Sequence, residues 1–269
     1  MIGCGRVGRT LGRLWQEHGL FEVQDVLTRS AASAANAIAF IGAGRSVEQL
    51  EQMRPADVWM LAVPDREIED VAVQLAQRAR PPTTELAFHC SGALGSDVLL
   101  ALKTKGWQTA SAHCLLSFAD PATALTQFAG TPCALEGDAL ATETLASVFG
   151  PIGARCFALA ADDKLLYHAG AVFATNFLPV LQSVAQQLWR DSGVPDDMAT
   201  TLQTTLLKNA VANLLALGPT GALTGPAARG DLALVQRQGD AVTDWDATAG
   251  AAYTALSQLA TRLALATSK

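Results

Sequence analysis

The sequence predicts an α/β fold, a doubly wound parallel sheet, followed by an all-α C-terminal domain. Through about residue 159, short β-type runs alternate with amphipathic helical stretches, which is the pattern of βαβ units around a parallel sheet. After this point the chain shows only long helical periodicity. We therefore expect two domains, residues 1–159 and 160–269.

The expected elements follow from this periodicity. In the first domain we expect strands at residues 22–28, 57–63, 85–90, 108–112, 131–135 and 154–158, and helices near residues 6–18, 30–37, 66–77, 96–103 and 140–149. In the second domain we expect helices at residues 164–190, with a kink at Pro179, and at residues 196–217, 231–238 and 246–265.

Composition excludes several classes of protein. The 269 residues are 50% hydrophobic and carry a net charge of −6, so the chain can build packed cores and lacks the basic footprint of a nucleic-acid-binding protein. No apolar tract reaches the ~20 residues that a membrane span needs. Five scattered cysteines and the lack of a secretory signal pattern predict a cytoplasmic protein with reduced thiols. We expect a small-molecule partner, not nucleic acid or a membrane.

A glycine-rich turn opens the chain. Gly3-Cys4-Gly5-Arg6-Val7-Gly8 is a G-x-G-x-x-G turn before a helix, the fingerprint of a Rossmann-like dinucleotide-binding domain. Its glycines allow a tight turn and let backbone N–H groups approach a pyrophosphate at a helix N-terminus. Only Met1 and Ile2 precede the turn, whereas strands usually have five or six residues, so we expect the natural chain to begin upstream.

The end of the next expected strand bears on the choice of dinucleotide. An acid that would hold the ribose 2′-hydroxyl is absent there, and Arg29 stands between the hydroxyls of Thr28 and Ser30. A guanidinium can pair with a 2′-phosphate, so the sequence favours NADP over NAD. The alternative is a surface arginine at a helix start without a ligand.

Further candidates follow the other strands, whose carboxyl ends meet at one edge of a parallel sheet. We expect the cofactor to contact Ala62, Val63, Pro64 and Asp65, and Ser91 and His113 to lie near the substrate. His113 could equally be a hydrogen-bonded structural histidine. The two His-Cys pairs do not predict a metal site, because adjacent strand residues point to opposite faces.

The second domain contributes polar residues in apolar surroundings. His168 and Asn176 are eight residues apart, about 12 Å along one face of a regular helix. They could belong to a functional site or could only make structural hydrogen bonds, which polar groups in apolar surroundings need. Arg229, in a glycine-rich turn that also contains Thr224, could bind a substrate carboxylate or pair with Asp231.

These motifs together resemble one family over essentially the whole chain. The residues that carry the resemblance are Gly3–Gly8, Ala62–Asp65 with Ile68, His89–Leu94, Ser111–His113, Tyr167 and His168 with Asn176, and Leu223–Pro226 with Arg229–Asp231. The family comprises oxidoreductases with a Rossmann-like N-terminal domain and a C-terminal helical domain of unknown function. Its fold is similar to those of pyrroline-5-carboxylate reductases, deazaflavin-dependent NADP oxidoreductases and β-hydroxyacid dehydrogenases. The resemblance implies NADP(H), hydride transfer and a homodimer built through the helical domain.

The sequence departs from its relatives at positions that matter. Cys114 follows His113 where the family usually has proline, and Gln238 replaces an expected histidine. Val172 stands where β-hydroxyacid dehydrogenases have a lysine before Asn176. Their proton-transfer chemistry therefore cannot be transferred to this chain.

Two functions fit these observations. The first is an NADP-dependent oxidoreductase that transfers hydride to or from a small carbonyl or imine, with His168 as the preferred proton donor, His113 as the second choice, Asn176 and Ser91 in the site, and Thr224 and Arg229 binding substrate. The second is a catalytically inactive protein that binds a dinucleotide for regulation. The substrate, the direction of the reaction and the size of the oligomer do not follow from the sequence.

Overall fold

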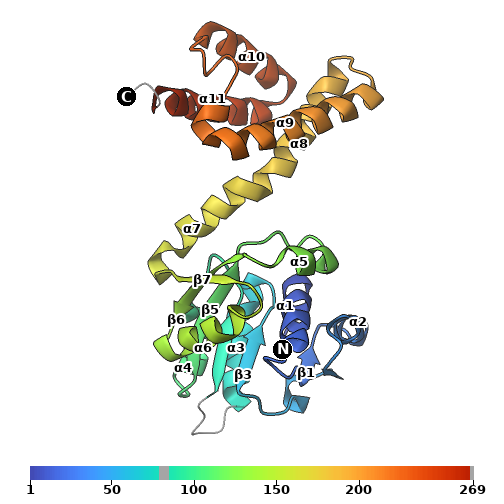
Figure 1. Cartoon of the computed structure of the whole chain (residues 1–269), viewed down its shortest axis with the longest axis vertical. Coiled ribbons are helices and arrows are strands. Elements are labelled where there is room, and N and C mark those ends of the chain that lie inside the picture. The colour runs from blue at the N-terminus through green and yellow to red at the C-terminus, as the bar shows by residue number, and fades with distance from the viewer. Residues whose placement is uncertain (79–84, 267–269) are drawn as a thin grey trace. The chain divides into compact units, whose positions relative to one another are not determined.

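The computed structural model describes residues 1–78 and 85–266 of the chain. The chain forms two compact units, Met1–Thr175 and Asn176–Lys269 (Figure 1). The first unit is a sheet covered by helices on both faces, and the second consists of helices. The predicted fold class, a parallel-dominated α/β sheet followed by a helical region, is thus confirmed.

The sheet of the first unit is parallel except at one pair of strands. Its strands are β1 (Asp25–Leu27), β2 (Arg45–Val47), β3 (Val58–Leu61), β4 (Leu86–His89), β5 (Gln108–Cys114), β6 (Pro132–Gly137) and β7 (Arg155–Ala158). The order is β2-β1 on one side and β3-β4-β5-β6-β7 on the other, with β6 antiparallel to β5. Isolated bridges from Ile2 to Leu27 and to Leu61 join the two parts.

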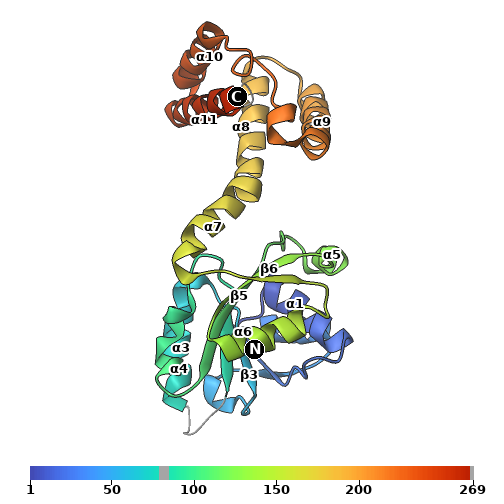
Figure 2. The same cartoon turned by 60° about the vertical axis from the view of Figure 1, so that its left-hand side comes forward.

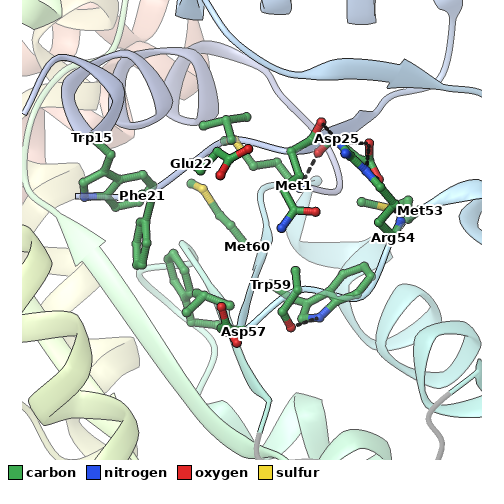
Figure 3. Close-up of a pocket in the computed structure, with 15 residues that line it drawn as sticks. Met1, Trp15, Phe21, Glu22, Asp25, Met53, Arg54, Asp57, Trp59 and Met60 are labelled. Atoms are coloured by element: carbon green, nitrogen blue, oxygen red, sulfur yellow. Dashed lines mark hydrogen bonds and ion pairs between the residues drawn. The ribbon is translucent and has the colours of Figure 1, made fainter. Parts of the chain in front are cut away.

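The segment around Ile2 occupies the central place in the sheet with very few residues. Its N–H donates to the Met60 carbonyl at 2.9 Å, and its carbonyl accepts from the Ala62 N–H at 2.7 Å. A cavity of about 210 Å³ lies next to Met1, and its walls include Asp25 of β1 and Trp59 and Met60 of β3 (Figure 3).

Helices cover both faces of the sheet (Figure 2). The helices of the first unit are α1 (Arg6–Glu17), α2 (Ala31–Ile41), α3 (Asp65–Arg78), α4 (Leu100–Lys103), α5 (Pro121–Gln127), α6 (Ala139–Phe149) and α7 (Lys164–Ala171), of which α7 leads away from the sheet. Short 3₁₀ turns lie at Leu50–Gln52, Ser96–Leu99 and Ala161–Asp163. Apolar residues of α1 and α6 form one core with Met60 and Phe88, whereas those of α3 and α4 pack with Trp59 and Ala87 on the other face. This alternation along β3 and β4 is what a doubly wound sheet requires.

The core on the α1 and α6 face is centred on aromatic rings. Trp15 makes edge-on contacts with Phe21, Phe88 and Phe149, at centroid distances of 5.2, 6.3 and 5.2 Å. Its indole N–H donates to the Val148 carbonyl at 3.1 Å, so the polar edge of the buried ring is satisfied. These contacts hold α1, and with it the glycine turn, against the sheet.

Several element boundaries differ from those expected. The strand expected at residues 22–28 covers only Asp25–Leu27, and residues 96–103 form a 3₁₀ turn followed by the short α4. Strand β2 and helix α5 were not predicted from the sequence. Strand β2 has three residues, too few for a periodic pattern. Helix α5 has a readable start, since Asp120 caps it by accepting from the Thr123 N–H at 2.8 Å and Pro121 follows.

Three cysteines form a row across neighbouring strands. The register pairs Cys114 with Cys133 and Cys133 with Cys156. The sulfur atoms of Cys114 and Cys133 lie 3.5 Å apart, and all five cysteines of the chain are free thiols.

The long helix expected at residues 164–190 is not continuous. After α7, a π-helical turn at Val172–Asn176 leads into α8 (Phe177–Asp191). The irregularity therefore precedes Pro179, which lies in the first turn of α8. Proline lacks the N–H that would bond to the carbonyl four residues earlier and its ring crowds that carbonyl, so the chain widens its turn just before the proline.

Three further helices complete the second unit: α9 (Asp196–Ala222), α10 (Leu232–Trp245) and α11 (Ala247–Ala266). Helix α9 extends beyond the expected residue 217 but is broken at Gly218, whose φ of 68° is not helical. Asp231 caps α10 by accepting from the Leu234 N–H at 3.1 Å. No helix in the described part of the chain combines the length and apolar character needed to cross a membrane.

The second unit leaves much of its apolar surface uncovered. Leu215 on α9 is 82% exposed, and Leu217 and Leu232 are also exposed. The sequence left open whether Leu256, Leu259 and Leu263 of α11 pack within their own domain or meet a second subunit, with packing inside the domain as the default. Leu256 and Leu259 are exposed, whereas Leu263 is half-buried.

Candidate functional site

The glycine turn has the conformation that its sequence predicts. Gly3 has a φ of +75°, and a Cβ there would lie 2.5 Å from the Ala62 carbonyl oxygen, so only glycine fits. Gly5 precedes α1 as its N-cap and provides no side-chain cap for the first N–H groups of the helix. These donors remain available to an anion.

A cavity of about 620 Å³ lies directly over this turn. Most of the expected cofactor-binding residues line it, namely Gly3, Gly5, Arg6, Val7, Gly8, Thr28, Arg29, Ala62, Val63 and Pro64. Ser30 and Asp65 do not line it. The sequence analysis missed several lining residues, which are Ile2, Cys4, Arg9, Leu27, Ser33, Glu67, Val71 and Phe118.

The end of β1 presents a cation and hydroxyl groups to the cavity. Arg29 is exposed and takes part in none of the ion pairs found among residues 1–78 and 85–266. The Thr28 hydroxyl donates to the Ser30 carbonyl at 2.8 Å. Ser30 instead caps α2, since its side chain accepts from the Ser33 N–H at 3.2 Å. Of the two flanking hydroxyls, only Thr28 therefore belongs to the cavity wall.

Asp65 and Ser91 connect the ends of β3 and β4. The Ser91 hydroxyl donates to Asp65 Oδ2 at 2.7 Å and accepts from the N–H groups of Ala93 and Leu94 at 3.2 and 3.1 Å. Ser91 thus closes the turn after β4 while Asp65 begins α3. This bond gives both residues a structural role at the edge of the sheet where a ligand would bind.

His89 has a structural role. Its Nδ1 accepts from the Ser91 N–H at 3.2 Å, so Nε2 carries the proton and donates to the Gly95 carbonyl at 2.9 Å. Burial lowers the pKa of His89, so the neutral form persists.

Two histidines meet over Gly92. A Cβ on Gly92 would collide with the rings of both His113 and His168. The two ring centroids lie 5.6 Å apart, and His113 Nδ1 lies 3.0 Å from the Tyr167 hydroxyl. Burial, the neighbouring His168 and the charge of Lys164 lower the pKa of His113 to about 4. Within the described residues, no three metal-ligating side chains gather into a possible metal site.

A buried lysine lies beneath this cluster. Lys164, the first residue of α7, is only 1% exposed, and its ammonium donates to Ser111 Oγ at 2.8 Å and to the Ser91 carbonyl at 3.2 Å. Ser111 donates in turn to Glu136 at 2.9 Å, and Glu136 also accepts from the N–H and hydroxyl of Ser96, each at 2.8 Å. Burial lowers the pKa of Lys164, while Glu136 and Asp65 oppose this effect.

The structure thus brings Ser91, Asp65, His113 and His168 together within the first unit. Asn176, Thr224 and Arg229 lie in the second unit and are exposed. The expectation that His168 and Asn176 share one helix face depended on a regular α-helix, but the π turn Val172–Asn176 interrupts it. The spacing of an α-helix therefore does not apply to these two residues.

Sequence reasoning missed Lys164, Glu136 and the role of Tyr167. A signal was present for Lys164 and His168, which are four residues apart and so lie on one face of α7. No local signal marks Glu136 or joins Tyr167 to His113, because their partners are 25 and 54 residues away in the chain.

Comparisons with known families agree with this two-part architecture. A family model described as a Rossmann-like domain matches residues 1–114, and a model described as a domain of unknown function, DUF2520, matches residues 131–260. No curated protein sequence matches the chain.

Solved structures share the fold over nearly the whole chain. The protein TM1727 from Thermotoga maritima is 24% identical with a TM-score of 0.76, over 100% of this chain and 98% of that one. An imine reductase from Myxococcus stipitatus in complex with NADP⁺ is 16% identical with a TM-score of 0.61, over 97% and 93% of the two chains. The pyrroline carboxylate reductase from Plasmodium falciparum with NADP bound is 11% identical with a TM-score of 0.59, over 98% and 96%.

The fold and the glycine turn define a Rossmann-type protein with a helical C-terminal region. More particularly, residues 1–114 match a Rossmann-like domain model and residues 131–260 match the DUF2520 model, so the predicted resemblance is confirmed.

Proposed function

We propose that the protein is an NADP-dependent oxidoreductase that transfers hydride to or from a small carbonyl or imine substrate. The observation that carries this proposal is the 620 Å³ cavity over the glycine turn, which is lined by Arg29 and by the end of β3. The steric demand at Gly3 and the uncapped start of α1 fit a dinucleotide pyrophosphate. Two structures with this fold, an imine reductase and a pyrroline carboxylate reductase, hold NADP.

In this proposal the residues of the chain bind, orient and transfer a proton. Arg29 would pair with the 2′-phosphate, and Ala62, Val63 and Pro64 would pack against the dinucleotide. A bound nicotinamide supplies or accepts the hydride. His168 would give the proton to the substrate, since His113 is neutral at physiological pH. Ser91 and Asp65 hold the turn that supports both histidines.

The first test is a calorimetric titration of the protein with NADPH and with NADH. We expect micromolar binding with a preference for NADPH, which would justify a search for turnover among keto acids, aldehydes and cyclic imines. His168→Ala should then lose turnover while keeping NADPH affinity. Absence of binding to either dinucleotide would contradict the proposal and favour a protein that acts through macromolecular interactions.

We also propose that the protein forms a homodimer through its helical unit. The exposed leucines of α9, which include Leu215 and Leu217, would otherwise leave a large apolar area in water. A second copy of the chain can cover such a surface with the same elements, as in most symmetric oligomers.

A further inference from the structure

The contact between Tyr167 and His113 bears on which ring nitrogen of His113 carries a proton. Tyr167 Oη lies 3.0 Å from His113 Nδ1, and this is the one partner found for the hydroxyl among the described residues. Burial raises the pKa of Tyr167, so the hydroxyl keeps its proton at neutral pH. A neutral imidazole has one bare nitrogen, a good acceptor for a phenol O–H. Donation from Tyr167 to Nδ1 therefore leaves the ring proton on Nε2.

The surroundings of His113 oppose a second proton on the ring. The groups that face it are Tyr167, His168 and Lys164 from α7, and Asp65 from the start of α3. Burial is the main influence on the pKa of His113, and His168 and the ammonium of Lys164 add to it, whereas Asp65 acts in the opposite direction. Asp65 is exposed to solvent, which weakens its effect relative to that of the buried Lys164.

Gly92 allows the Nε2 edge of the ring to lie directly against the turn after β4. A Cβ at Gly92 would lie 2.7 Å from both Nε2 and Cε1 of His113 and would also collide with His168. The absence of a side chain thus keeps the Nε2–H of His113 and the ring of His168 at one point of the sheet edge.

We propose that His113 is a neutral hydrogen-bond donor through Nε2–H, that Tyr167 is the positioning residue that fixes this tautomer, and that the pair serves a carbonyl substrate. The inference rests on the proposed hydride transfer and specifies its substrate class. It separates the two histidines, since His113 would stabilise charge and His168 would transfer the proton.

The charge distribution distinguishes a carbonyl from an imine. When hydride adds to a carbonyl carbon, the π electron pair moves to oxygen, and a neutral N–H donor stabilises the negative charge that develops there. The oxygen then takes the proton of His168, which yields an alcohol and the oxidised nicotinamide. An imine is reduced as a cationic iminium, whose charge the hydride neutralises, so no negative charge develops there for a neutral N–H donor to stabilise. Proteins of one fold often differ in substrate, so the imine reductase neighbour does not decide this point.

Histidine nitrogen NMR tests the tautomer without any substrate. The chain has four histidines, and two provide internal controls. His89 should show the Nε2–H tautomer because Nδ1 accepts from Ser91, whereas His18 should show Nδ1–H because this nitrogen lies 2.8 Å from the Leu14 carbonyl. We expect His113 to match His89 at pH 7 and to stay neutral at pH 5.5.

Tyr167→Phe is the matched variant, since it removes only the hydroxyl. We expect the His113 signal to move toward a mixture of tautomers while the signals of His89 and His18 stay in place, which also reports an intact fold. An Nδ1–H tautomer of His113 in the wild type, titration near pH 6.5, or an unchanged His113 spectrum in Tyr167→Phe would overturn the assignment.

Turnover tests the substrate class separately. With NADPH, we expect reduction of aldehydes or ketones and a loss of kcat of tenfold or more in Tyr167→Phe, with KM changed little. Turnover of cyclic imines alone would overturn the carbonyl assignment. If the wild-type protein turned over neither carbonyl substrates nor cyclic imines, the proposed function would be contradicted. The NMR spectra would still decide the tautomer of His113.

Discussion

The ammonium of Lys164 donates a hydrogen bond to the Ser111 hydroxyl at 2.8 Å, and this hydroxyl donates to Glu136. Two buried ionisable side chains from α7 and β6 are thus joined through a serine on β5. Burying either charge alone would be costly, so the two are expected to depend on each other energetically.

This dependence predicts a non-additive pair of substitutions. Lys164→Met should lower the free energy of unfolding by about 3 kcal/mol, because it leaves the Glu136 carboxylate buried without its cation. Adding Glu136→Gln should recover part of this loss, with a coupling of about 1–3 kcal/mol. Urea denaturation of the wild type, both single variants and the double variant measures the cycle, and simple additivity would show that the two charges are independent.

A pair of glycine substitutions tests the packing of the glycine turn. Gly3→Ala should destabilise the protein by about 2 kcal/mol or more, because alanine is strained at positive φ and its Cβ would clash with Ala62. Gly5→Ala should leave thermal stability nearly unchanged, since φ is −76° and no atom lies within 4 Å of its Cβ. Thermal unfolding compares the two, and equal stability of both variants would contradict the packing described here.

Arg29 is expected to discriminate between the two nicotinamide dinucleotides. Arg29→Asp should weaken NADPH binding by about 1.5–3 kcal/mol, since a charge-assisted bond to the 2′-phosphate is lost. Affinity for NADH should change much less. Arg155→Asp, on the exposed surface of β7, makes the same charge change away from the cavity and serves as the control. Equal losses for both dinucleotides would argue against reading of the phosphate by Arg29.

The carboxylate of Asp25 should make the protein sensitive to acid. Burial opposes its ionisation, but hydrogen bonds from Arg54 and Arg45 outweigh this effect and lower its pKa to about 2. Asp25 binds fewer protons in the folded state than in the unfolded state, so stability falls as the pH drops from about 4 to 2. Since both arginines are half exposed, we expect a contribution of about 1–2 kcal/mol.

Chemical denaturation at pH 6, 4 and 3 tests this expectation. Asp25→Asn should be less stable at pH 6 and show a flatter pH profile than the wild type. Asp70→Asn, at an exposed position of α3, should follow the wild-type profile. Parallel profiles for wild type and Asp25→Asn would show that the arginine pair does not stabilise the charged form.

The apolar surface of the helical unit predicts an oligomer. Leu215→Glu should convert a dimer into a monomer, because a carboxylate cannot be buried without a partner at a subunit interface. Leu140→Glu is the matched control, since Leu140 is 60% exposed on α6 of the first unit. Sedimentation velocity distinguishes the two states, and a monomeric wild type would contradict the proposed dimer.

The glycine turn and the order of the first unit could be predicted from the sequence because their signals are local. Gly3 is required by its positive φ and by the close approach of Ala62, and the βαβ alternation follows from short periodic segments. The boundaries were less predictable. The break after α7 depends on Pro179, but where the chain absorbs the missing bond depends on packing that the sequence does not display.

The cluster around Gly92 could be predicted only in part. His113 and Ser91 follow from their places at strand ends, which lie at one edge of any parallel sheet. Nothing in the sequence marks Lys164 as buried, but the structure buries it, because its partners come from the turn after β4 and from β5. Such pairings depend on long-range contacts, so one sequence does not reveal them.

The row formed by Cys114, Cys133 and Cys156 gives the sheet its own chemical reporters. Hydrogen bonding among the thiols and burial raise the pKa of Cys133 and Cys156, so thiolates are scarce and alkylating reagents should react slowly with the folded protein. Labelling of these thiols would then follow the separation of β5, β6 and β7. The rate of labelling would show whether this edge of the sheet opens by itself or only when the whole unit unfolds.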